Sequence, residues 1–311
     1  MHLILTSSYD VTTDMLVDRL GKKALRINND RPQDHEIQIN QNGFEISDSY
    51  GRRVTDKTLV TAILRKPAPQ TLSKIDQEIH AFRETSAAHA SLLQLIAHKW
   101  PEKLPIDSNK IREIGKFVQL DVAKEYFSTA PWAFTTHPQK SGLKDDAVLK
   151  TLHGMPFSKP DETSDAKFLY VQPVKLSELA DGWPWFLQVK IEARFDLTIL
   201  YVDGKMFAQR LDRKTFKGLD WRKHIGTEMD AQWENVVLPE ILSKKIDAYM
   251  RKLGLRFGRL DFLLPSENID EALFLEVNPN GQWAWMDLKM NNGIFDSMIE
   301  FLTTPRNNKV Q

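Results

Sequence analysis

The alternation of apolar and polar residues predicts a strand, a loop and a helix at the start of the chain. Apolar residues fill positions 3–5, polar residues follow, and apolar residues then recur at helical spacing up to Gly21. Strand patterns follow between residues 23 and 66, with a hairpin turn expected at residues 40–43 and prolines ending the last strand. From residue 76 to residue 100 the spacing is helical again. We therefore predict an N-terminal α/β domain over residues 1–105.

The middle of the chain, residues 106–187, predicts a second subdomain that begins with a helix. Cap-type residues open a predicted helix over residues 107–127, and a proline-bearing segment ends it. Strand patterns follow at residues 147–150 and 167–176. The polar, proline-bearing segment between them, residues 155–165, is typical of a mobile loop.

The remaining residues, 188–311, predict a C-terminal subdomain built on an antiparallel sheet. A strand, a bend and a hairpin that turns at Asp203 and Gly204 are followed by a helix over residues 239–253. Two further strands, joined by an acidic turn, end near residue 279. We find no internal repeat and no low-complexity tract in the sequence.

The last two predicted strands each carry polar residues where apolar ones are expected. The two-residue period of a strand places Arg259 and Asp261 on one face of the first strand. In the second strand it places Glu276 and Asn278 together, with Leu275 on the opposite face. If the two strands pair as a hairpin, the two carboxylates and the amide converge.

Converging oxygen atoms of Asp261, Glu276 and Asn278 predict a magnesium site. Mg²⁺ prefers oxygen ligands and uses one or two protein carboxylates together with phosphate oxygens and water. The alternative is a sheet with one solvated face, on which charged residues carry no function. The apolar and aromatic flanking residues, and a turn specified by Pro279 and Gly281, fit this alternative poorly.

Composition narrows the class of protein. Lysine plus arginine and aspartate plus glutamate each number 42 in 311 residues, which argues against a protein that coats nucleic acid. The chain has no cysteine, so disulfides, thiolate nucleophiles and cysteine-bound metals are excluded and a reducing cytoplasm is expected. No signal peptide or membrane-spanning stretch is recognisable. We expect a soluble cytoplasmic protein without a nucleic-acid or membrane partner.

At this point the order and spacing of several motifs resemble the ATP-grasp superfamily. The series is Lys116, Lys150 in "VLK", a hinge at "LQVKI", Asp196, then Asp261 and "EVN". Within the superfamily the sequence is most similar to the microviridin-type, or graspetide, maturases of ribosomal peptides, through "DWR", "FLEVNPNGQWAWMD", "LRKP", "ALRIN" and "KFVQLDVAKEYF" before "TAPWAFTT". These matches span nearly the whole chain. The resemblance implies an α/β ATP-grasp fold with a pre-ATP-grasp domain, a lid and an antiparallel catalytic sheet.

The resemblance also implies roles for individual residues around a nucleotide. Lys116 and Lys150 would contact the phosphates of ATP, although a lone lysine is most often a surface residue. The hinge that binds adenine would comprise Gln188, Val189, Lys190 and Ile191. Asp196 would lie near the ribose, although an ordinary strand with a polar edge explains this segment equally well.

Arginines form the second implied group. Arg259 would stabilise a developing acyl phosphate, or pair with Asp261, or both. In "DWR", Asp220 and Arg222 would face the substrate, and Arg222, whose guanidinium suits a carboxylate or phosphate, would also act in catalysis. Alternatively, Trp221 anchors a loop while its neighbours are solvated.

Three further arginines are weaker candidates. They are Arg210 in catalysis, and Arg213 and Arg65 in substrate binding. Lys66 follows Arg65 where relatives often have a second arginine. The chain also departs from many relatives at Thr198, where they have an arginine, and in this it resembles D-alanine ligases.

The function that the resemblance implies is that of an ADP-forming, ATP-dependent peptide macrocyclase. It would activate Asp or Glu side chains of a ribosomal precursor peptide, with leader and core, and join them to Ser or Thr as esters or to Lys as amides. ATP and Mg²⁺ are the implied cofactors, a homodimer is expected, and a lid carrying residues 152–165 would exclude water. The alternatives are a ligase of free amino acids or dipeptides, and a regulatory ATP-binding module without catalysis.

Overall fold

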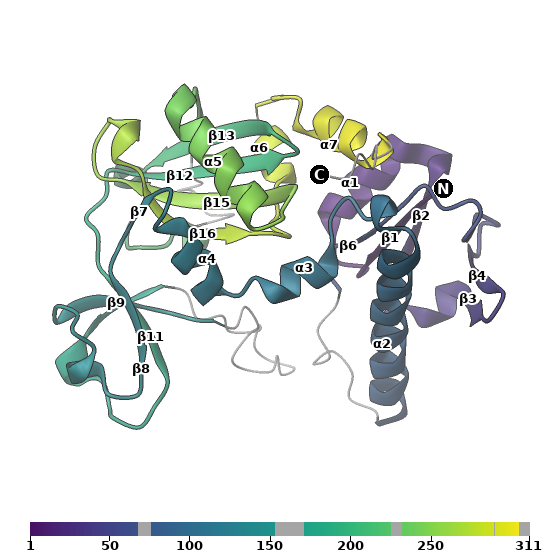
Figure 1. Cartoon of the computed structure of the whole chain (residues 1–311), viewed down its shortest axis with the longest axis horizontal. Coiled ribbons are helices and arrows are strands. Elements are labelled where there is room, and N and C mark those ends of the chain that lie inside the picture. The colour runs from purple at the N-terminus through teal and green to yellow at the C-terminus, as the bar shows by residue number, and fades with distance from the viewer. Residues whose placement is uncertain (68–75, 153–170, 225–231, 289, 305–311) are drawn as a thin grey trace.

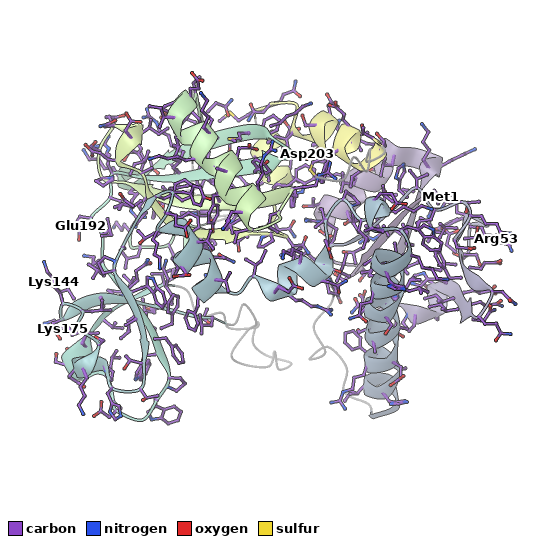
Figure 2. All side chains as sticks on the ribbon, in the orientation of Figure 1. Met1, Arg53, Lys144, Lys175, Glu192 and Asp203 are labelled. Atoms are coloured by element: carbon purple, nitrogen blue, oxygen red, sulfur yellow. The ribbon has the colours of Figure 1, made fainter. Side chains whose placement is uncertain are left out.

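The computed structural model describes residues 1–67, 76–152, 171–224, 232–288 and 290–304. Within them the strands form four sheets that follow one another across the molecule (Figure 1). The two N-terminal sheets lie at one end, the four-stranded sheet lies at the other, and the six-stranded sheet lies between them. In Figure 2, Met1 and Arg53 mark the first end, and Lys144 and Lys175 mark the second.

The N-terminal α/β unit has a parallel sheet and a small antiparallel sheet. The parallel order is β2 (Ala24–Asn28), β1 (His2–Thr6) and β6 (Thr61–Leu64). The antiparallel sheet contains β3 (His35–Asn40), β4 (Gly43–Asp48) and β5 (Arg53–Thr55). The predicted strands and hairpin are confirmed, but the three-residue β5 was too short to predict. The helices are α1 (Val11–Leu20), which ends at Gly21 as predicted, and α2 (Asp76–Lys99).

The four-stranded sheet is antiparallel and holds a small core of its own. Its strands, in spatial order, are β10 (Gln172–Lys175), β9 (Asp146–Lys150), β11 (Trp185–Val189) and β8 (Trp132–Thr135). Ala147, Leu176 and Leu187 are buried in it. β8 lies where the sequence indicated only the end of a helix. The predicted mobile loop at 155–165 and the start of the predicted strand at 167–176 lie outside the described residues.

The six-stranded sheet has two very different faces. Its strands, in spatial order, are β14 (Trp233–Val236), β13 (Lys205–Asp212), β12 (Phe195–Val202), β15 (Phe257–Leu264), β16 (Leu273–Asn278) and β7 (Ser128–Thr129). One face packs Leu197, Leu260 and Val277 against α4 (Lys116–Ala123) and α5 (Glu240–Lys252). The other face is where the strand period places the polar residues. Among the described helices, none is long and apolar enough to cross a membrane.

A third core joins the six-stranded sheet to the N-terminal unit. Two C-terminal helices that were not predicted, α6 (Ala284–Leu288) and α7 (Ile294–Thr303), pack between α1 and the ends of β12 and β15. Figure 1 shows α7 beside α1, although they come from opposite ends of the chain.

The helix predicted over residues 107–127 is two helices. Asp107 caps α3 (Ser108–Glu113), and its carboxylate accepts from the backbone N–H groups of Asn109 and Lys110. Gly115 then has extended backbone angles, φ −73° and ψ 169°, before α4 begins. The prediction of one helix was therefore wrong, because the apolar spacing continues across a glycine at which the backbone changes direction.

The hairpin of β15 and β16 forms as predicted but contains a bulge. Asp261 pairs with Glu276, yet the next residue, Phe262, pairs with Phe274. Leu275 is therefore the extra residue of β16, and it lines the same cavity as Glu276. The prediction that Leu275 lies on the opposite face from Glu276 was wrong, because a bulge shifts the strand period locally.

Candidate functional site

A cavity of about 640 Å³ is lined by the polar face of the six-stranded sheet, by β9 and β11 of the four-stranded sheet, and by the start of α4. Most of the site residues predicted from the sequence line it. They are Lys116, Lys150, Gln188, Val189, Lys190, Ile191, Asp196, Arg213, Asp220, Arg222, Arg259, Asp261, Glu276 and Asn278. Residues from separate segments of the chain thus meet in one place, while their individual roles stay predictions.

The centre of the cavity is the cross-strand pair of Asp261 and Glu276. The amide of Asn278 donates to Asp261 Oδ2 and to Glu276 Oε1, each at 3.1 Å. Arg259 Nη2 also donates to Asp261 Oδ2, at 3.1 Å, and Thr198 Oγ1 donates to Asp261 Oδ1 at 2.9 Å. Two acidic groups and an amide therefore converge as the two-residue period predicted.

Lys116 reaches this centre because of how α4 is attached to β16. Gln119 of α4 accepts a hydrogen bond from the backbone N–H of Val277 at 3.1 Å, beside the stretch of β16 that β7 leaves unpaired. This contact holds the start of the helix over β16, and Lys116 forms an ion pair with Glu276. Lys116 is therefore a cavity residue. No sequence signal identified the positioning role of Gln119.

Electrostatics couple the two lysines to Glu276. Burial raises the pKa of Glu276, but Lys116 and Lys150 outweigh burial and hold that pKa below its usual range. Burial lowers the pKa of Lys150 to about 8, an effect that Glu276 opposes and Lys116 strengthens. The site thus holds two cations beside an ionised carboxylate.

Two side chains of the "DWR" motif, Asp220 and Arg222, bind each other on the cavity wall. Asp220 is 5 % exposed, and its carboxylate accepts from Arg222 Nε at 2.8 Å and from Nη2 at 2.5 Å. Burial raises the pKa of Asp220, but the bonds from Arg222 outweigh burial and lower it. The alternative in which both residues are solvated is wrong for Asp220.

An aromatic cluster that the sequence did not predict as part of the site adjoins this motif. Trp221 and Trp233 line the cavity with ring centroids 5.2 Å apart, and Trp285 lies 5.0 Å from Trp233. The two lining tryptophans rest on buried Leu211 and Phe216. Because they come from different elements, no motif links them in the sequence.

Arg213 extends the cavity wall at the end of β13. Its Nη1 donates to both carboxylate oxygens of Asp196, at 2.8 and 2.9 Å. Burial raises the pKa of Asp196 to about 7, Arg213 opposes the shift, and Asp261 and Asp220 add to it. Asp196 is therefore committed to an ion pair in addition to the ribose contact predicted for it.

The predicted adenine hinge lines the cavity through all four of its residues. The backbone N–H of Val189 donates to the carbonyl of Pro131 at 2.8 Å, so this donor is already used within the protein. Gln188 is buried and its side chain donates to the carbonyl of Ala130 at 3.4 Å. Among the described residues, no backbone hydrogen bond outside helices and strands involves Lys190 or Ile191, so a base at the hinge would meet these two residues.

Comparison with known proteins finds solved structures that share this fold. No protein-family model matches the chain, and no curated protein matches it. The macrocyclase MdnC from Microcystis aeruginosa MRC, solved with its precursor peptide MdnA, is 23% identical with a TM-score of 0.77, over 97% of this chain and 99% of that chain. A RiPP-associated ATP-grasp ligase from Chryseobacterium gregarium, solved with ADP and a leader and core peptide, is 20% identical with a TM-score of 0.80, over 100% of this chain and 99% of that chain.

The macrocyclase MdnB from Microcystis aeruginosa MRC is 21% identical with a TM-score of 0.71, over 97% of this chain and 98% of that chain. The chain has the ATP-grasp fold. The predicted fold class is therefore confirmed.

Two predicted site residues do not line this cavity as the described residues define it. Arg210 pairs across the strands with Leu197, whose side chain lies on the face packed against helices, and it binds Glu234 and Glu267 instead. The prediction that Arg210 lies in the site was therefore wrong, because the strand period puts its side chain on the face of the sheet opposite the cavity.

Arg65 is buried away from the cavity, between the parallel sheet and the turn after β16. Its Nη1 donates to Asn280 Oδ1 at 2.6 Å, and the side-chain amide of Asn280 donates back to the carbonyl of Leu64 at 3.2 Å. Gln282 accepts from Arg65 at 3.3 Å and from Thr12 at 2.6 Å. We call these reciprocal bonds the Arg65–Asn280 clamp. The basic contact predicted for Arg65 is made with the protein itself.

The donor set fits a magnesium ion. Within the described part of the chain, no three His, Asp or Glu side chains gather in a way that could hold a metal ion. A magnesium ion in a nucleotide site needs fewer than three such side chains, because one or two carboxylates suffice when phosphate oxygens and water complete the ligands. Asp261 and Glu276 supply two carboxylates, and Asn278 supplies a neutral oxygen. The ion pair of Glu276 with Lys116 shows that positive charge is favoured beside these carboxylates.

Proposed function

We propose that the protein is an ADP-forming, ATP-dependent peptide macrocyclase. The observation that carries the proposal is the convergence of Asp261, Glu276 and Asn278 beside Lys116 and Lys150 in a cavity of about 640 Å³. The similar structures of MdnC and of the Chryseobacterium gregarium ligase, solved with peptides and, in the second case, with ADP, support a peptide substrate and a nucleotide.

In the proposed reaction, an Asp or Glu carboxylate of the peptide attacks the γ-phosphorus of ATP. The bond to the β-phosphate oxygen breaks, and an acyl phosphate and ADP result. A Ser or Thr hydroxyl, or a Lys amine, of the same peptide then attacks the acyl carbon. It loses its proton as inorganic phosphate leaves, and the product is a ring closed by an ester or an amide.

The residues of the cavity divide this work by charge. Lys116 and Lys150 would neutralise the phosphates, and residues 188–191 would hold the adenine. Asp261, Glu276 and Asn278 would hold Mg²⁺, which neutralises charge on the phosphate oxygens. Arg222, oriented by Asp220, presents a planar guanidinium to the carboxylate of the peptide, with Arg213 as a second cation on the same wall.

Mass spectrometry tests the reaction class. Short peptides encoded beside this gene, with repeated Thr or Lys and Glu or Asp, are incubated with the protein, ATP and Mg²⁺. We expect a loss of one water per linkage and release of ADP that depends on the peptide. Release that depends on free amino acids would indicate an amino-acid ligase instead. ATP binding without turnover on any of these substrates would indicate a regulatory module.

The cytoplasmic location, the homodimer, and the choice between ester and amide belong to the same proposal. Sedimentation of the purified protein measures the oligomeric state. Hydrolysis of the product at alkaline pH distinguishes the two linkages, because esters are cleaved and amides persist.

A further inference from the structure

Thr198 occupies an unusual place in the cavity. It lies on β12 directly across from Asp261 of β15, and it is 2 % exposed although it lines the cavity. Its hydroxyl donates to Asp261 Oδ1 at 2.9 Å. The hydroxyl of a buried threonine on a strand needs a partner, and here the partner is one of the proposed ligands of Mg²⁺.

The two oxygens of Asp261 are not equivalent. Oδ2 accepts two hydrogen bonds, from Arg259 and from Asn278, while Oδ1 accepts one, from Thr198. A carboxylate offers about four lone-pair positions, roughly two on each oxygen. Oδ2 is therefore saturated by the protein, and among the described residues no second donor occupies the remaining position on Oδ1.

The bond from Thr198 also fixes the rotation of the carboxylate. With Oδ2 held by two donors and Oδ1 held by a third, the group cannot turn about its terminal torsion without breaking a hydrogen bond. That torsion is otherwise soft for aspartate. The unused position on Oδ1 thus keeps one orientation in the cavity.

We propose that Thr198 is a positioning residue that orients Asp261 so that Oδ1, and not Oδ2, binds the divalent cation. This inference rests on the proposed function, because it concerns the same cation site. Thr198 does not carry charge. The charged donor to Asp261 is Arg259, which binds Oδ2. The contribution of Thr198 is therefore geometric.

Binding of Mn²⁺ in the presence of a non-hydrolysable ATP analogue, measured by the loss of the free-ion EPR signal, tests the proposal without turnover. We expect Thr198→Val, which keeps the shape and removes the hydroxyl, to raise the Kd for Mn²⁺ about tenfold or more. Thr198→Ser restores the donor and should stay within about threefold of the unaltered protein. Affinity for the analogue without metal should not change in either variant.

Thr61→Val is the matched control. Thr61 is also a buried strand threonine with one side-chain hydrogen bond, 2.8 Å to His2 Nδ1, but it lies in the N-terminal sheet. Its loss should leave Mn²⁺ affinity unchanged. Equal Mn²⁺ affinity in Thr198→Val and the unaltered protein, or equal loss in the Val and Ser variants, would overturn the inference alone. An unaltered protein that binds no Mn²⁺ with the analogue would overturn the proposed function as well.

Discussion

Glu276 is the residue on which the charge balance of the cavity depends. Glu276→Gln keeps the shape of the side chain but removes the ion pair with Lys116 and one anionic ligand. We expect peptide-dependent ADP release to fall by at least about a hundredfold, because the transferring phosphate loses preorganised electrostatic stabilisation. The melting temperature should change little. Glu267→Gln, at an exposed residue that pairs with Arg210, is the control and should retain full activity.

Arg222 and Arg210 provide a second matched pair of residues. Both were predicted to act in catalysis, but Arg222 lines the cavity and Arg210 lies outside it. We expect Arg222→Ala to lower kcat/KM for the peptide at least about tenfold while the Kd for ATP changes less than about threefold, because the guanidinium is proposed to bind the peptide carboxylate. Arg210→Ala should leave both constants near normal. Equal loss of peptide processing and ATP binding in Arg222→Ala would move this residue to the nucleotide side.

Lys150 predicts a pH dependence of nucleotide binding. Burial lowers its pKa from 10.5 to about 8, so the side chain is a cation below pH 8 and neutral above it. If it binds phosphate, affinity for a non-hydrolysable ATP analogue should fall as pH rises through about 8. Lys150→Arg remains charged over this range and should lose that dependence. A pH profile identical in both proteins would remove Lys150 from the phosphate contact.

Sequence reasoning predicted the site well where the strand period alone decides the geometry. Asp261 and Glu276 follow from a two-residue period and one hairpin, so their convergence needed no further information. Arg210 obeys the same period but lies on the face packed against helices. Which face that is depends on the pairing of β13 with β12, which the sequence of β13 alone does not give. The contact that Arg65 makes depends on Asn280, in a turn 215 residues further along the chain, and no local sequence pattern predicts such a contact.

At the scale of elements, local signals predicted the type of structure better than its interruptions. Strands and hairpins with strong alternation were confirmed, but the bulge at Leu275 depends on how two strands align. The break at Gly115 was missed because helical spacing on either side of the glycine is continuous. Short strands such as β7 and β8 form because neighbouring strands supply hydrogen bonds, and their own sequence carries little signal.

The turn after β16 has room only for a glycine at position 281. A Cβ at Gly281 would lie 3.1 Å from the Cβ of Arg259 and 3.2 Å from that of Asn278. We expect Gly281→Val to destabilise the protein by about 1–3 kcal/mol through overpacking and to weaken Mn²⁺ binding by displacing Asn278. Urea unfolding and the EPR titration measure the two effects. Gly115→Ala meets open space and should leave metal binding unchanged.

At the scale of the whole molecule, the cores show which parts of the chain are joined. The third core and the Arg65–Asn280 clamp both connect the N-terminal unit to the six-stranded sheet. The four-stranded sheet has a separate small core and contacts the remainder through Phe186 and Trp132, near Phe117 of α4. The division of the chain at residues 105 and 187 stays a prediction, because the boundaries of independently folding units have to be measured.

Removing the clamp tests how strongly the N-terminal unit supports the cavity. Asn280→Ala leaves the buried guanidinium of Arg65 without its 2.6 Å acceptor. We expect a loss of about 1–3 kcal/mol in the free energy of unfolding, or more because the group is charged. Asn292→Ala, at an asparagine near the surface that bonds Asn235, is the control. Equal stability of the two variants would show that the clamp contributes nothing.

The clamp also distinguishes the two walls of the cavity, the six-stranded sheet and the four-stranded sheet. The turn that carries Asn280 immediately follows the strand bearing Glu276 and Asn278, and it is fastened to the first sheet of the protein. The N-terminal unit and the six-stranded sheet are therefore joined at the cavity. The four-stranded sheet, β8 to β11, has only a separate small core, so we expect amide hydrogen exchange to be faster there than along β15 and β16.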